Sequence, residues 1–161
     1  MVLVRAVVTN HSSFEEWPSP PPRRASAAAE CVGIINDAEE FALWVSPHIL
    51  RNVERVLVEV FGWVPDQAER YTNRLREVAA RSGGGEVDPD EVSPGIRITD
   101  CPDFVDNRIL ELASVVDAFL IVSNDMEHLI PMSPWRGIPI IVDSELVARV
   151  DAARRAGRRR W

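Results

Sequence analysis

Short, mostly apolar segments that alternate with amphipathic helical segments are the feature that most constrains this fold. The apolar, often β-branched residues of buried strands occur at 3–8, 41–45, 119–122 and 138–142. Strands with few polar residues on either side are typical of parallel sheets, because helices cover both faces of such sheets. The pattern therefore predicts an α/β fold, a three-layer sandwich with a central, mainly parallel sheet.

The segments between these strands predict helices at about 25–37, 46–61, 66–81 and 106–116, with a last helix from Ser144. Ser46 followed by Pro47 is a strong helix start, because serine caps the free N–H groups and proline fits the first helical position. A further short strand is expected at 96–98. The chain divides into one domain at 1–150 and an Arg-rich C-terminal tail at 151–161.

Composition fits a globular protein in the cytoplasm, since 46% of residues are hydrophobic and 27% are charged. No apolar run approaches the roughly 18 residues that span a bilayer, so no membrane partner is expected. The first residues lack the pattern of a signal peptide. Cys31 and Cys101 lie far apart and are expected to be reduced, buried thiols.

The charge distribution gives two opposing indications about nucleic acid. The net charge of −7 argues against wholesale wrapping of RNA or DNA. All 18 basic residues are arginine, however, and several gather just before Trp161. The predicted contacts to phosphates are Arg154, Arg155, Arg158, Arg159 and Arg160. The alternative is that these arginines form a solvated helix end.

Two carboxylates are placed to meet at one edge of the predicted sheet. Asp125 follows directly on the buried strand 119–122, and Asp106 opens the preceding helix. Working residues gather at the carboxyl ends of parallel strands, and one or two carboxylates suffice to bind Mg²⁺. In the alternative, Asp106 caps its helix and Asp125 bonds to turn backbone.

The order of these motifs resembles the PIN-domain family, closest to the branch of toxins from toxin–antitoxin pairs. The resemblance spans about residues 3 to 147. It is carried by Thr9-Asn10 after the first strand, Ser46-Pro47, the stretch Asp103 to Ala113, and Ser123-Asn124-Asp125.

The resemblance implies a ribonuclease site in which four acidic residues hold one or two Mg²⁺ or Mn²⁺ ions. The third and fourth acids correspond to Asp106 and Asp125, which are the implied catalytic and metal-binding residues. The first acid is replaced by Val8 and the second by Asn52. The implied supporting residues are Thr9, Asn10, Asn52, Asp103 and Ser123. Asp103 is a candidate to compensate for a missing acid, whereas Glu54 is expected to face elsewhere.

Losing two of four carboxylates limits the chemistry, because two-metal hydrolysis needs enough negative charge to hold two dications about 3.5–4 Å apart. We therefore expect one weakly bound ion, and a weak or inactive ribonuclease that acts as an RNA- or protein-binding module. An active Mg-dependent endoribonuclease that uses Asp106 and Asp125 is the alternative. A receiver- or flavodoxin-like signalling domain is a third hypothesis.

The expected partners are RNA, an antitoxin-like protein, and a second copy of the chain in a homodimer formed through helices at 47–81. Among the remaining candidates, the histidines lack paired metal spacing and are expected at the surface or at helix caps. Trp44 is expected in the core, and Trp135 in an exposed loop.

Overall fold

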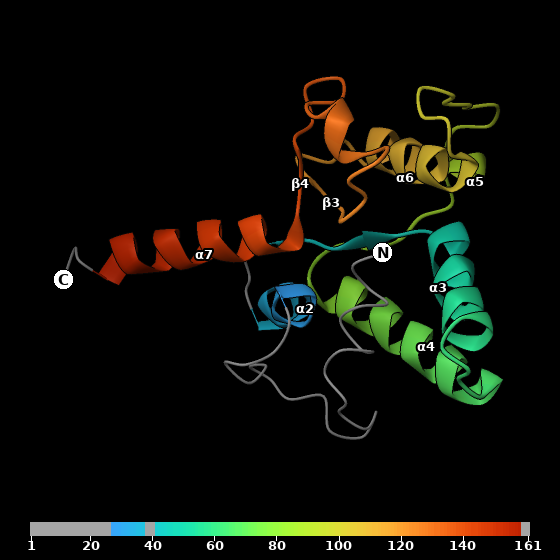
Figure 1. Cartoon of the computed structure of the whole chain (residues 1–161), viewed down its shortest axis with the longest axis horizontal. Helices are drawn as coiled ribbons and strands as arrows, with labels where there is room; N and C mark the ends of the chain where they lie inside the picture. Colours follow the sequence, from blue (N-terminus) through green and yellow to red (C-terminus); the bar gives the residue numbers. More distant parts are fainter. Residues whose placement is uncertain (1–26, 38–40, 159–161) are drawn as a thin grey trace.

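The computed structural model describes residues 27–37 and 41–158, which form a mixed α/β fold with short parallel strands (Figure 1). In chain order the elements are α2 (Ala27–Asp37), β1 (Trp44–Val45), α3 (Pro47–Glu59), α4 (Pro65–Arg81), β2 (Gly85–Glu86), α5 (Pro89–Val92), α6 (Phe104–Val115), β3 (Ile121–Val122), the 3₁₀ helix η1 (Ile130–Met132), β4 (Ile140–Ile141) and α7 (Asp143–Arg158). The predicted first strand at 3–8 lies outside the described residues.

The described strands form two separate pairs. β1 pairs with β2, with Trp44 opposite Gly85, and β3 pairs with β4, with Ile121 opposite Ile140; both pairs are parallel. The predicted parallel pairing is confirmed at this level. Within the described residues the strands form two-stranded sheets, and a third strand that joins them is not among them.

Two sequence-based expectations about strands need correction. The expected strand at 96–98 is irregular, because the Ile98 N–H donates to the Glu111 carboxylate at 3.0 Å and not to another strand. The partner of β1 is β2, which begins with the last glycine of the run 83–85. Gly83 has φ +86°, and a side chain at Gly84 would meet the Leu43 carbonyl oxygen at 2.0 Å. The glycines therefore let α4 turn closely back along β1.

Helix starts follow the sequence signals. The Ser46 hydroxyl accepts a hydrogen bond from the Ile49 N–H at 3.2 Å, and Pro47 occupies the first turn of α3. Buried residues of α3 and α4 form one apolar cluster with Val45. A second cluster joins α6 to β3 and β4, and a third joins α2 to α7. In Figure 1, α2, α3 and α4 lie below β1, and α5 and α6 lie above it.

The C-terminal arginines belong to a helix. α7 continues to Arg158 and extends away from the rest of the molecule (Figure 1). Among residues 27–37 and 41–158, no helix combines the length and the apolar character needed to cross a bilayer.

Candidate metal centre

The start of α6 supplies the first part of the site. The Asp103 side chain caps the helix, because its Oδ1 accepts from the Val105 N–H at 2.6 Å and the Asp106 N–H at 3.4 Å. Asp103, and not Asp106, is thus the cap. Asp106 lies in the first turn and is 8% exposed. Asn107 fixes the preceding turn through paired bonds with the Cys101 backbone, at 2.9 and 2.7 Å.

The turn after β3 supplies the second part. The Ser123 hydroxyl accepts from the Asp125 N–H at 3.1 Å, which fixes the backbone of the turn. Asp125 Oδ1 accepts from the N–H groups of Glu127 and His128 at 2.8 and 2.9 Å. These bonds are the turn contacts expected of an aspartate in this position. They leave Asp125 Oδ2 directed at the His128 ring, whose Nδ1 lies 3.3 Å away.

The two parts meet at His128. Its Nδ1 lies 3.8 Å from Asp106 Oδ2 and 3.3 Å from Asp125 Oδ2, so the imidazole is close to the carboxylates of α6 and of the β3 turn. Asp103, Asp106 and His128 each offer a ligand atom, and these atoms lie within 4.8 Å of one another. The structure therefore brings Asp103, Asp106, Asp125 and Ser123 together, with a histidine that the sequence pattern had assigned to the surface.

The negative charges of Asp103, Asp106 and Asp125 are only partly balanced by neighbouring groups, as the pKa values of the site show. Burial raises the pKa of Asp106 to about 6, and its hydrogen bond to Asp125 and the charges of Asp125 and Asp103 add to this. Burial acts in the same direction on Asp125, but backbone hydrogen bonds from His128 and Glu127 outweigh it and lower the pKa of Asp125. The hydrogen bond to Asp125 raises the pKa of His128. The pair thus holds a proton on Asp106 more readily than ordinary carboxyls do.

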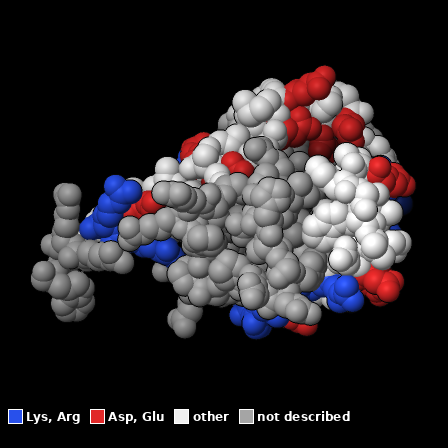
Figure 2. All heavy atoms as spheres, turned by 60° about the horizontal axis from the view of Figure 1, so that its bottom comes forward, with Lys and Arg blue, Asp and Glu red and all other residues white. Residues whose placement is uncertain are grey.

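The donor set suits a single divalent cation. Carboxylate oxygens are ligands for both Mg²⁺ and Mn²⁺, but an imidazole nitrogen suits transition metals better than Mg²⁺. A bound cation would relieve the repulsion among the three aspartates. Figure 2 shows Asp and Glu side chains gathered at the top of the molecule.

A thiol also lies beside the centre. The Cys101 Sγ is 3.7 Å from Asp106 Oδ2, and Cys101 is 3% exposed. Burial raises the pKa of the Cys101 thiol, a backbone hydrogen bond with Asp103 opposes this, and the charges of Asp106 and Asp103 add to the rise. Cys101 is thus a neutral hydrogen-bond donor to Asp106. Both cysteines are free and buried, as the sequence predicts.

The remaining predicted site residues either have other partners or lie outside the described residues. The Asn52 side-chain oxygen accepts from Arg55 of its own helix at 2.9 Å. Glu54 faces α4, where it accepts from the Thr72 hydroxyl at 2.5 Å, so the prediction that it points away is confirmed. Arg154 and Arg155 are exposed on α7, with Arg155 3.6 Å from Asp151. Thr9, Asn10, Arg159 and Arg160 lie outside the described residues, as does the side chain of Arg158.

A second charged cluster occupies the next turn of α6. Arg108 and Glu111 form a salt bridge in which the carboxylate is 2% exposed. The outer side of Arg108 binds Asp90 at 2.7 Å, and Glu111 also accepts from the Ile98 N–H. Each charge in this group of Asp90, Arg108 and Glu111 has an opposite partner, so we assign the group a role in stability and call it the structural cluster.

Two tryptophans are placed opposite to expectation. Trp135 is 5% exposed, and its indole N–H donates to Asp100 at 2.8 Å, because that partner lets the ring be buried without losing a hydrogen bond. Arg136 stacks over the ring and binds the same Asp100. Trp44 is 36% exposed within the described structure.

No protein-family model, curated protein or solved structure matches this chain.

Proposed function

We propose that this chain is a PIN-like protein with an incomplete metal site, which binds one divalent cation and single-stranded RNA and cleaves RNA weakly or not at all. The observation that carries the proposal is the meeting of Asp103, Asp106 and Asp125 at His128. The proposal includes a three-layer arrangement in which the two parallel pairs are halves of one central sheet.

The number of carboxylates supports one ion. Asp103 also caps α6, and Asp125 Oδ1 is used by two backbone N–H groups, so each has one oxygen available to a metal. Together with Asp106 and His128 this gives at most four protein ligands around one cation. Two dications held about 3.5–4 Å apart need more bridging carboxylate than this.

The cation would also make RNA binding possible at an acidic edge. Without it, the net charge of −7 and the gathered aspartates repel phosphates. With it, one phosphate oxygen can complete the coordination, as is common for Mg²⁺ and Mn²⁺. Arg154 and Arg155 on the exposed side of α7 offer additional phosphate contacts.

Metal binding is tested by thermal unfolding. Mn²⁺ at about ten times its Kd should stabilise the folded chain by about 1.4 kcal/mol, a rise of a few degrees in Tm. Asp125→Asn should abolish this rise, whereas Asp66→Asn, at an exposed helix start, should retain it. An unchanged Tm of the natural protein at millimolar Mn²⁺ and Mg²⁺ would sink the proposal.

RNA binding and cleavage are tested separately with a fluorescent single-stranded RNA. Anisotropy should rise with protein in the presence of Mn²⁺ and much less in its absence, while the RNA stays largely intact. Rapid metal-dependent cleavage that Asp125→Asn abolishes would favour the active endoribonuclease instead. Val8→Asp combined with Asn52→Glu should raise cleavage if the missing acids belong at these positions.

A further inference from the structure

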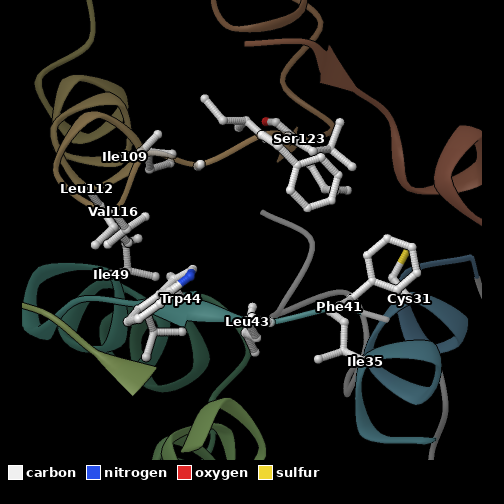
Figure 3. A pocket seen from close by; sticks show the side chains of 18 of the residues that line it. Cys31, Ile35, Phe41, Leu43, Trp44, Ile49, Ile109, Leu112, Val116 and Ser123 are labelled. Atoms are coloured by element: carbon white, nitrogen blue, oxygen red, sulfur yellow. The ribbon is translucent and has the colours of Figure 1, made fainter. Parts of the chain in front are cut away.

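An apolar groove separates the two pairs of strands (Figure 3). The β1 segment, with Leu43 and Trp44, forms one side, and the β3 segment that ends in Ser123 lies opposite. Helix α6 and helix α2 form the other two sides. The groove is thus bounded by two strands facing each other and by two helices facing each other, which is the surrounding of a central strand in a parallel sheet.

Within residues 27–37 and 41–158, the edges of β1 and β3 that face the groove pair with no other strand. The carbonyls of Leu43 and Val45 accept from β2, and the N–H groups of Ile121 and Ser123 donate to the segment of β4. Backbone groups of successive strand residues point to opposite edges. The peptide groups of Trp44 and Val122 therefore point away from β2 and β4, toward the groove. Buried backbone groups of this kind require hydrogen-bond partners.

The helical walls require an occupant that is apolar on both faces. Ile109 and Leu112 of α6 and its C-cap residue Val116 face the groove from one side, and Cys31 and Ile35 of α2 from the other (Figure 3). An ordinary amphipathic strand would set its polar face against one of these walls.

We propose that Leu3–Val8 of the same chain occupies this groove as the strand between β1 and β3, so that the two parallel pairs become one sheet. Its sequence, Leu-Val-Arg-Ala-Val-Val, places apolar residues on both alternating faces, with Arg5 as the one charge. Among the described residues that line the groove, Asp117 is the one that carries a charge, and that charge is opposite to the charge of Arg5.

The order of the chain supports this occupant. Residues 3–8 precede α2, α2 lines the groove, and β1 follows α2 at the edge of the groove. A strand, a helix and a parallel neighbouring strand in this order form a βαβ unit. The segment from 9 to 26 is long enough to lead from such a strand to the start of α2.

The first test is hydrogen exchange of the full-length natural protein, followed by mass spectrometry without added metal. Amides of residues 4–8 should exchange at least about 100-fold more slowly than those of 12–17, as hydrogen-bonded strands do. Equally fast exchange in the two segments would overturn the proposal. Protection that is lost on dilution would overturn it too, because a second copy would then be the occupant.

The second test compares two variants of the full chain. Val7→Asp places a charge in the apolar groove and should lower Tm by at least about 5 °C. It should also expose the groove to an apolar fluorescent dye. Ser12→Asp, beyond the proposed strand, should change neither property. Equal behaviour of the two variants would contradict the proposal. Because neither test uses metal, failure here is distinct from failure of the metal centre.

Discussion

The two charged clusters on α6 differ in how their charges are balanced. In the structural cluster, Arg108 lies between Glu111 and Asp90, and the buried carboxylate also accepts from a backbone N–H. In the metal centre, Asp103, Asp106 and Asp125 gather around one histidine, and the pKa of Asp106 rises to about 6. In the structural cluster, the protein's own groups balance every charge. The arrangement in the metal centre is relieved by a proton or a cation, which is the property expected of a binding site.

The largest effect is expected in the structural cluster. Glu111→Ala should lower the free energy of unfolding by about 3–5 kcal/mol, because it removes the buried one of the two carboxylates that pair with the Arg108 guanidinium. It also removes the acceptor of the Ile98 N–H. Urea unfolding measures the loss. A loss below about 1 kcal/mol would mean that the two clusters do not differ as described.

The metal centre should instead show a pH dependence. Because the folded pKa of Asp106 is raised, the folded chain binds more protons than the unfolded chain between about pH 4 and 6. Stability should therefore fall as pH rises through this window, by about 1–3 kcal/mol from Asp106. The lowered pKa of Asp125 stabilises the folded chain fully above about pH 4, and this contribution is lost as the pH falls below that value.

The raised pKa of His128 makes folding stability continue to fall as the pH rises above about 6.5, the usual pKa of histidine. Asp106→Asn, which mimics the neutral acid, should flatten the fall between pH 4 and 6. The measurement is urea unfolding at several pH values in metal-free buffer. The same slope in the natural protein and in Asp106→Asn would remove the electrostatic argument for the site.

A smaller effect should distinguish His128 from the carboxylates. His128→Gln should weaken Mn²⁺ binding by about tenfold and Mg²⁺ binding much less, because imidazole suits transition metals. Calorimetric titration with each ion measures the difference. An equal loss for both ions would assign His128 a role in positioning Asp125, with which it hydrogen bonds.

The smallest effect is expected at an exposed ion pair. Glu59→Ala removes the partner of Arg55, at 3.0 Å on the surface of α3, and should change stability by less than about 0.5 kcal/mol. It is the matched control for Glu111→Ala, since both remove a glutamate from an arginine within one helix. A larger loss would indicate that burial does not explain the difference between them.

Sequence patterns predicted those helix ends that depend on residues close by in the chain. Ser46-Pro47 set the start of α3, and Ser82 with the glycines set the end of α4, because capping and backbone freedom act within a few residues. The pattern failed for β2 and for the expected strand at 96–98. A two-residue strand carries little propensity, and only its partner Trp44–Val45 makes it a strand.

For the site, the sequence by itself determined which carboxylates lie near the expected strand and helix ends. Tertiary structure decided that Asp103 is the cap, that Asp106 is buried and that His128 lies close to both Asp106 and Asp125. These facts depend on how α6 packs against the turn after β3. Contacts between segments far apart in the chain leave no periodicity in the sequence, so only the folded molecule shows them.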